Sequence, residues 1–337
     1  MKRRDVVLYA YNALREVLDA YSGERFLVVC DDVKRDVGWV FAEAGLELGL
    51  STRLVTLETK SKLFRQDLPE FLREVLVTGK PDLAVNCLRG EAEETPFRIK
   101  IIHLETRGKT TRLGHGPGIT LDMLTRGALA LSIEEYREMN SVADRVIATT
   151  EGAREIMVTT PGGTDLRLSI EGRGFFKDMT ITADKWGNLP TGEVTVGPVE
   201  NSLEGELVCD LAVGGIGLVK DPVAITCKHG EAVRVEGADE AVVAGVKEVL
   251  SVDRLASIVG EMAVGLNPKA RMVQEFVEAE KISGTAHIAF GRNIDYPTGG
   301  KNSSANHMDF LMDKPTVTAV FPDKRRKEIV VDGKNVL

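Results

Sequence analysis

The sequence predicts an N-terminal parallel-sheet α/β domain followed by a strand-rich α+β domain. Two patterns support this fold class. In the first part of the chain, short apolar runs alternate with segments of helical spacing, which is typical of a parallel sheet covered by helices. Beyond residue 150, turn-forming glycines recur at short intervals, as expected of antiparallel strands. We therefore expect domains at residues 1–150 and 151–337.

The elements of the first domain follow from the spacing of apolar residues. The predicted strands span residues 25–30, 51–57, 82–87 and 110–113, and the predicted helices between them span 33–50, 68–77 and 96–107. The first strand is followed by Asp31-Asp32-Val33-Lys34 and not by a glycine-rich phosphate loop, so we predict no dinucleotide site. The glycine-rich segment 114–118 is expected to form a loop with a sharp turn.

The second domain is expected to begin after a charged amphipathic helix at 133–154. A strand at 155–160 follows, and one further helix is predicted near 238–249. Of the five histidines, His103 and His115 fall in the first domain, where a lone histidine is more often structural than a ligand.

Composition excludes several classes of protein. No apolar run approaches the roughly 18 to 20 residues that span a bilayer, and we expect a soluble, cytoplasmic protein without a membrane partner. The net charge of −8 argues against nucleic acid as a partner, since a phosphate backbone needs a basic face. The four cysteines are spaced without any Cys-x-x-Cys pair, and we predict them to be small core residues: Cys30, Cys87, Cys209 and Cys227.

The stretch from residue 285 to residue 312 contains the residues best suited to a metal site. His307 and Asp309 form a His-x-Asp pair, and on a strand residues two apart point to the same face. His287 lies in another strand-like run, Thr285-Ala286-His287-Ile288-Ala289. Two histidines and one aspartate satisfy the facial triad that holds a single Fe(II), whereas additional carboxylates would favour a two-metal hydrolytic centre.

Two acids are candidates for such additional ligands. Glu193 follows Gly192 in a turn-like context, and Glu261 follows Gly260 in an apolar run. Either position is unusual for an acid that only needs contact with water. A solvated turn acid remains the alternative interpretation for each of them.

Four separated segments, taken in order, carry a resemblance to a known family. The segments Asn-Leu-Pro-Thr-Gly-Glu-Val (188–194), Gly-Glu-Met-Ala-Val-Gly-Leu-Asn-Pro (260–268), Gly-Thr-Ala-His-Ile-Ala-Phe-Gly (284–291) and Asn-His-Met-Asp-Phe (306–310) resemble motifs of the thermophilic metallo-aminopeptidases of the aminopeptidase T and S type. Residues 123–129 and 160–166 are also similar to stretches of that family. The resemblance covers roughly residues 120 to 312, and the ordered combination is more specific than any single motif.

The resemblance implies a set of metal ligands and a reaction. The implied ligands are Glu193, Glu261, His287, His307 and Asp309, with Tyr296 as the nearest match to a tyrosine ligand. Two divalent cations, Zn(II), Co(II) or Mn(II), would then activate a water molecule that hydrolyses the N-terminal residue of a peptide. Glu261 or Glu193 would carry the proton to the leaving amine. The resemblance also implies a homodimer.

Two other functions remain open at this stage. Ring-cleaving 2,5-dihydroxypyridine dioxygenases resemble the same aminopeptidases, and would use one Fe(II) on His287, His307 and Asp309. A non-catalytic binding protein on the same scaffold is the third possibility, because the segment between His287 and His307 is shorter than in the aminopeptidases. In the aminopeptidases that segment helps to shape the substrate cleft, so the sequence predicts no substrate preference.

Overall fold

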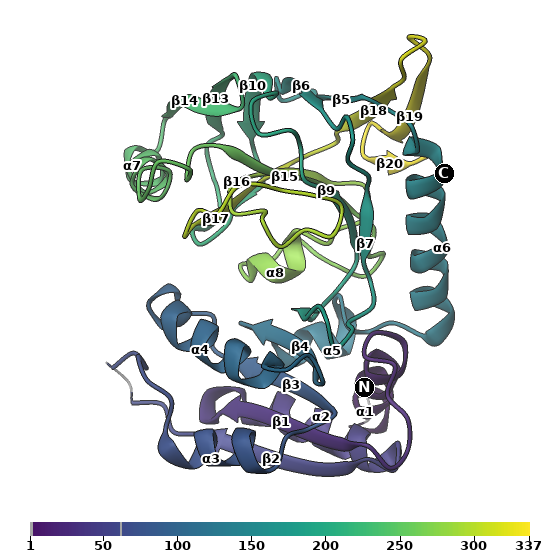
Figure 1. The fold of residues 1–337 in the computed structure, drawn as a ribbon, viewed down its shortest axis with the longest axis vertical. Coiled ribbons are helices and arrows are strands. Elements are labelled where there is room, and N and C mark those ends of the chain that lie inside the picture. The colour runs from purple at the N-terminus through teal and green to yellow at the C-terminus, as the bar shows by residue number, and fades with distance from the viewer. Residues whose placement is uncertain (1–2, 61–62) are drawn as a thin grey trace. The chain divides into compact units, whose positions relative to one another are not determined.

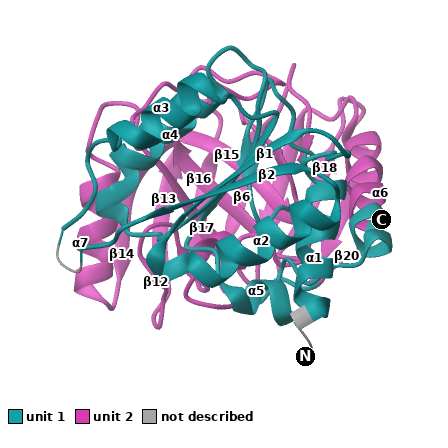
Figure 2. Ribbon diagram, turned by 90° about the horizontal axis from the view of Figure 1, so that it is seen from below, with its two compact units in different colours: residues 1–138, 178–191, 269–271 teal, residues 139–177, 192–268, 272–337 magenta. Residues whose placement is uncertain are grey.

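The computed structural model describes residues 3–60 and 63–337, which form two compact units (Figures 1 and 2). Unit 1 comprises residues 1–138, 178–191 and 269–271, and unit 2 comprises residues 139–177, 192–268 and 272–337. The units interleave along the chain, and the single domain limit at residue 150 stays a prediction.

Unit 1 is built around a five-stranded sheet in the order β2-β1-β3-β4-β8, and its strand pairs run parallel. Its strands are β1 (Arg25–Asp31), β2 (Ser51–Leu57), β3 (Leu83–Leu88), β4 (Arg112–Pro117) and β8 (Gly187–Asn188). Its helices are α1 (Arg3–Glu16), η1 (Asp32–Lys34), α2 (Arg35–Glu47), α3 (Glu70–Thr78), η2 (Ala92–Glu94), α4 (Thr95–Thr106) and α5 (Leu121–Arg126). The predicted α/β class is confirmed.

The two faces of this sheet follow from the alternation of side chains along β1. Leu27 and Val29 point to one face, where they share a buried apolar cluster with Leu72 of α3 and Phe97 of α4. The alternate residues of β1 point to the other face, against which α2 packs. A strand that is buried on both faces therefore reads as the continuous apolar run that the sequence shows.

Two glycines allow α2 to pack closely on β1. A Cβ atom at Gly38 would lie 2.7 Å from Sγ of Cys30, and one at Gly45 would lie 2.5 Å from the ring of Phe26. Any larger side chain at either position would push the helix away from the sheet. All four cysteines, Cys30 included, are buried free thiols within the described part of the chain, which confirms their predicted core placement.

The glycine-rich segment 114–118 was expected to be a loop, and this prediction was wrong. Strand β4 continues through residue 117, with Gly114 and Gly116 inside it. A Cβ atom at Gly114 would lie 2.6 Å from Leu189, and one at Gly116 would lie 3.1 Å from the carbonyl oxygen of Asn86. The glycines therefore serve close packing within the sheet, and the turn comes only at Gly118, with φ +75°.

Unit 2 contains two sheets whose described strand pairs are antiparallel. The first is eight-stranded and consists, in spatial order, of β14 (Glu231–Gly237), β13 (Val223–Lys228), β10 (Glu204–Cys209), β6 (Asp165–Ser169), β5 (Glu155–Thr159), β18 (Thr316–Val320), β19 (Arg326–Val331) and β20 (Lys334–Asn335). The second is seven-stranded and consists of β12 (Gly217–Leu218), β11 (Ala212–Val213), β17 (His307–Met312), β16 (Ala286–Gly291), β15 (Val259–Gly265), β9 (Glu193–Val196) and β7 (Phe176–Asp178). The predicted strand-rich second part is confirmed.

Three helices complete the fold. They are α6 (Ile133–Thr150), α7 (Glu240–Val249) and α8 (Phe276–Ala279). Figure 1 shows the eight-stranded sheet on one side of the seven-stranded sheet, and the thiol of Cys209 in β10 donates to the carbonyl oxygen of Leu311 in β17 at 3.3 Å. The two sheets therefore share a core, and the other face of the seven-stranded sheet is available for polar residues.

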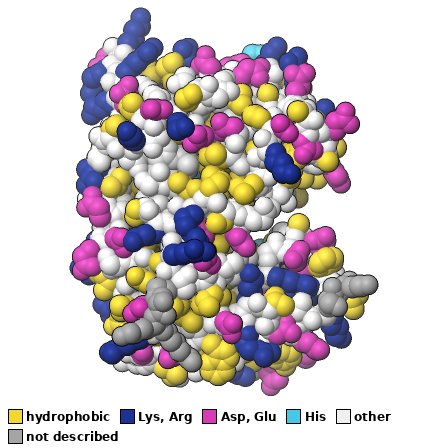
Figure 3. Space-filling model, turned by 180° about the vertical axis from the view of Figure 1, so that it is seen from behind, with side chains coloured by type: hydrophobic (Ala, Val, Ile, Leu, Met, Phe, Trp, Pro, Cys, Tyr) yellow, Lys and Arg dark blue, Asp and Glu magenta, His cyan; other side chains and the backbone are white. Residues whose placement is uncertain are grey.

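The surface carries charges of both signs. On the face shown in Figure 3, acidic and basic side chains are interspersed, with basic groups gathered at the β18–β19 hairpin. In the range that the structure describes, the helices are too short or too polar to traverse a bilayer.

Glu105 of α4 predicts a pH-dependent stability of unit 1. Its carboxyl group is buried and accepts a hydrogen bond from Nδ2 of Asn86 at 2.7 Å. Burial raises the pKa of Glu105 from 4.5 to about 8. Between these values the folded protein keeps a proton that the unfolded chain has lost, so the free energy of unfolding falls by about 1.4 kcal/mol for each pH unit.

Replacement Glu105→Gln tests this assignment. The amide keeps an acceptor for Asn86 but has no charged form, so the variant should lose the Glu105 part of the pH slope and be more stable than the parent at about pH 8. Urea unfolding at several pH values between about 5 and 8 measures the slope. The control is Glu74→Gln at an exposed position of α3, which should leave the slope unchanged. An unaltered slope in Glu105→Gln would contradict the assignment.

Candidate metal centre

The register of β16 with β17 brings the predicted histidines and aspartate to one face of the seven-stranded sheet. Ala289 pairs with Asp309, and Gly291 pairs with His307. Paired residues of antiparallel strands point to the same face, and so do residues two apart on one strand. His287, which lies two residues before Ala289, therefore shares this face with His307 and Asp309.

The two predicted glutamates reach the same face from the neighbouring strands. Glu261 of β15 pairs with Ala289 of β16, and Glu193 of β9 pairs with Gly265 of β15. The strand partners of both acids, Ala289 and Gly265, have small side chains or none. They therefore leave room on this face of the sheet for the longer polar side chains.

The distances between the polar atoms show how closely the side chains converge. Nε2 of His307 lies 2.9 Å from Oε2 of Glu261 and 3.3 Å from Oδ1 of Asp309. Nε2 of His287 lies 3.9 Å from the same Asp309 oxygen and 3.7 Å from Oε2 of Glu193. The structure thus brings together the five side chains selected from the sequence, and their role as ligands stays a prediction.

This donor set fits a divalent cation. Ligand distances of about 2.0 to 2.2 Å place neighbouring donor atoms roughly 3 Å apart. The separations of 3.3 Å and 3.9 Å from Asp309 to the two imidazoles need only a small adjustment to meet that value. One ligand atom each from Glu261, His307 and Asp309 already lies within 4.8 Å of the other two.

Glu261 is held by two hydroxyl groups. Oγ1 of Thr195 donates to Oε1 of Glu261, and the phenol of Tyr296 donates to Oε2. The ring of Tyr296 also packs edge to face on Phe176, with ring centres 5.1 Å apart. The phenol of Tyr296 therefore contacts the cluster through Glu261, and its role as a ligand stays a prediction.

The electrostatics of the cluster favour one ionisation pattern. Burial disfavours the charged form of Glu261, but the hydrogen bond and positive charge of His307 outweigh it and hold the pKa of Glu261 well below its ordinary value. Desolvation also disfavours the charged form of the partly exposed His307, but the charge of Asp309 leads the effects that raise its pKa well above the ordinary value. Burial and the charge of Glu261 raise the pKa of Tyr296, which remains a neutral phenol.

The orientation of His307 is set by the backbone. Its Nδ1 lies 2.9 Å from the carbonyl oxygen of Arg292, which can accept the ring proton and leave Nε2 directed at the carboxylates. Nδ1 of His287 is buried and has no hydrogen-bond partner among the residues that the structure describes.

Sequence reasoning missed Lys281, whose side chain is buried beside the cluster. Lys281 is 1% exposed, and its ammonium group contacts Oε1 of Glu193 and, at 2.7 Å, Oε1 of Glu280. Burial, with the charges of Glu193 and Asp309, raises the pKa of Glu280 to about 8 against the opposing effect of Lys281. In sequence, the run Glu278-Ala279-Glu280-Lys281 is typical of a solvated helix, and the apolar segment that follows it was the only signal of burial.

The first-domain histidines have structural placements. His115 lies in β4, where burial lowers its pKa to about 3, and its ring packs edge to face on Trp186 at 6.0 Å. His103 is exposed on α4.

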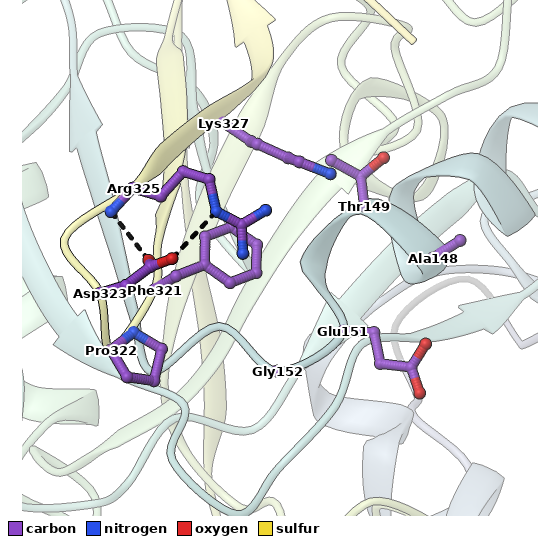
Figure 4. Close-up of a pocket in the computed structure, with 9 residues that line it drawn as sticks. All are labelled: Ala148, Thr149, Glu151, Gly152, Phe321, Pro322, Asp323, Arg325 and Lys327. Atoms are coloured by element: carbon purple, nitrogen blue, oxygen red, sulfur yellow. Dashed lines mark hydrogen bonds and ion pairs between the residues drawn. The ribbon is translucent and has the colours of Figure 1, made fainter.

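A surface hollow of about 360 Å³ lies elsewhere in unit 2, between the end of α6 and the β18–β19 turn (Figure 4). Arg325 stacks over the ring of Phe321 there, at 4.5 Å, and is hydrogen-bonded to Asp323. None of the cluster residues lines this hollow, and we assign it no chemistry.

Comparison with known proteins places the chain in a family. Residues 131–335 match the family model described as NicX, 2,5-dihydroxypyridine 5,6-dioxygenase. The chain belongs to this family. The match spans the whole candidate metal centre, including every cluster residue from Glu193 to Asp309. Among curated proteins, none matches the chain.

Two solved structures share the fold of this NicX-family chain. One is 2,5-dihydroxypyridine dioxygenase from Pseudomonas putida KT2440, with a TM-score of 0.72 and 17% identity over 100% of this chain and 98% of the other. The second is wild-type AmpT from Thermus thermophilus, with a TM-score of 0.74 and 18% identity over 99% of each chain. The predicted resemblance to aminopeptidase T is thus supported at the level of the fold, while the matching family is that of the dioxygenase.

Replacement of the clustered side chains should weaken metal binding. We expect His287→Ala and Asp309→Asn each to weaken the binding of a divalent ion by more than the 10- to 100-fold that is typical of losing an outer hydrogen-bond partner. Equilibrium dialysis followed by elemental analysis measures the affinity. The control is His103→Ala, an exposed histidine of α4, which should bind like the parent. Full affinity in Asp309→Asn would exclude this carboxylate as a ligand.

Proposed function

We propose that the chain is an oxygenase with a single Fe(II) that opens the ring of a dihydroxylated pyridine. One observation carries the proposal: each glutamate that a second ion would need is already held by another group. Glu261 accepts from two hydroxyl groups, and Glu193 contacts the ammonium of Lys281. His287, His307 and Asp309 remain, and they form the two-histidine, one-carboxylate set of non-haem Fe(II) oxygenases.

The side chains around this set have defined tasks in the proposed reaction. Fe(II) with open coordination positions would supply the redox chemistry with O₂ and a binding point for the ring hydroxyl groups. Thr195 and Tyr296 hold Glu261 beside His307, where its carboxylate contacts Nε2 of the ring. Arg292, through its carbonyl oxygen, keeps the ring of His307 in place.

The surroundings of the cluster suit an aromatic substrate. The edge-to-face pair of Tyr296 and Phe176 adjoins Glu261 and offers an apolar ring surface next to a polar acceptor. A planar hydroxylated ring needs both, since its face is apolar and its hydroxyl groups are donors. The description of the matched family names such a substrate.

A two-metal aminopeptidase is the second candidate, and one distance favours it. Oε2 of Glu193 lies 3.7 Å from Nε2 of His287, so Glu193 also belongs to the cluster. With Glu261, His307 and Asp309, the set would then hold two Zn(II), Co(II) or Mn(II) ions, and Glu261 or Glu193 would carry the proton to the leaving amine. The likeness to AmpT supports this reading at the level of the fold.

Metal stoichiometry and substrate separate the candidates. The full chain is purified anaerobically, loaded with Fe(II) and analysed for metal, and O₂ uptake is recorded with 2,5-dihydroxypyridine. We expect one iron per chain and consumption of O₂ that depends on the substrate. Two ions per chain, with hydrolysis of amino-acid amides and no O₂ uptake, would establish the aminopeptidase instead. One bound ion with neither activity would favour a binding protein that uses the same scaffold.

A further inference from the structure

We infer that the ammonium group of Lys281 occupies the place of a second divalent cation and thereby restricts the centre to one metal ion. The inference deepens the proposed function and rests on its one-metal centre. It assigns to Lys281 the part of a specificity-determining residue, because the number of ions decides whether the scaffold suits oxygenation or hydrolysis.

The arrangement around Glu193 is that of a bridging carboxylate. Its Oε2 faces the imidazole of His287, at 3.7 Å from Nε2, and its Oε1 contacts the ammonium of Lys281. In two-metal sites the ions lie about 3.5 to 4 Å apart, and a carboxylate commonly binds one with each oxygen. Here one oxygen faces the proposed metal ligands and the other already faces a fixed positive charge.

Burial makes the ammonium a structural component of the centre. Lys281 is 1% exposed, Glu193 is 7% exposed and Glu280 is 8% exposed. A buried ammonium is stable only when carboxylates compensate its charge, and buried carboxylates need a cation in the same way. Glu193 therefore requires a cation, which Lys281 supplies in this chain, and the carboxyl group of Glu280 contacts the same ammonium group.

The backbone positions Lys281 for this task. Its amide donates to the carbonyl oxygen of Glu278 at 3.1 Å, and its own carbonyl oxygen accepts from the amide of Asn267 at 2.8 Å. The segment also crosses close to Gly265, where a Cβ atom would lie 2.1 Å from the carbonyl oxygen of Ile282. Gly265 is the β15 residue that pairs with Glu193, so the close approach brings the lysine to the bridging carboxylate.

Removing the positive charge of Lys281 should change the number of divalent ions that the chain binds. Removal of the ammonium leaves the Glu193 carboxylate buried without its cation, and a divalent ion can bind it together with the carboxyl group of Glu280. The Lys281→Ala variant should therefore bind two Mn²⁺ ions per chain under conditions in which the parent binds one. Lys281→Arg keeps the charge and should bind one, and Lys247→Ala, an exposed lysine of α7, serves as the neutral control and should also bind one.

The experiment uses the full chain, with equilibrium dialysis against Mn²⁺ and elemental analysis as the primary measurement. Thermal unfolding with and without Mn²⁺ is the second, because a ligand that binds the folded state raises the melting temperature. Mn²⁺ should stabilise Lys281→Ala more than it stabilises the parent. Lys281→Gln, which keeps a polar chain of similar length without the charge, replaces the alanine variant if that variant does not fold, and it too should gain a second ion.

The outcomes distinguish this inference from the proposed function. One ion per chain in the parent and still one in the folded Lys281→Ala and Lys281→Gln variants would overturn the inference and leave the oxygenase proposal standing. Two ions in the parent would overturn the inference, because the ammonium would then exclude nothing. One ion in the parent and two in the variants, without any ring cleavage, would support the role of Lys281 while the proposed oxygenase function fails.

Discussion

The antiparallel register between β16 and β17 is the constraint on which the candidate centre depends. It is fixed from the opposite face of the sheet, where Phe290 and Phe310 are fully buried and pack edge to face with ring centres 5.7 Å apart. Because side chains alternate, a slip of one residue would turn these rings toward the polar face and direct His307 and Asp309 into the core. Hydrophobic packing on one side therefore determines the chemistry on the other.

The polar face must also balance its charges within a small volume. Four carboxyl groups, two imidazoles and an ammonium group meet there, and most of them are shielded from solvent. Such groups are stable together only because each carboxylate has a donor or a cation nearby. Thr195 and Tyr296 perform this task for Glu261, and Lys281 performs it for Glu193, where we infer that its ammonium group limits the face to one ion.

The sequence predicts most of the fold and most of the cluster for the same physical reason. Strands buried on both faces appear as apolar runs, as in residues 26–30, and strands with one polar face show the two-residue spacing that identified His307 and Asp309. Glu193 and Glu261 were recognisable because acids stood in apolar or glycine-rich surroundings. Each of these signals is local in the chain.

The missed features depend on contacts that are remote in sequence. Gly114 and Gly116 lie inside strand β4 because Leu189 and the backbone of Asn86 leave room only for glycine. The sequence of the segment itself does not predict these contacts. The burial of Lys281 arises similarly, because its ammonium group contacts Glu193, which lies far earlier in the chain. Local periodicity predicts which face of a strand or helix a residue occupies. It does not predict which charged side chains from remote segments lie on that face.

Our proposal gives a physical reason why a dioxygenase and an aminopeptidase can share one fold. In this chain the strands bring two imidazoles and an aspartate to one face, a donor set that suits one divalent ion. Glu193, the first residue of β9, is a buried carboxylate that needs a positive charge beside it. Either a divalent ion or an ammonium group can supply that charge. A mobile ion would bring a second binding point for substrate and water, whereas a lysine brings charge alone. On our proposal, the reaction of this chain depends on the cation beside Glu193, while the strands that hold the carboxylate stay the same.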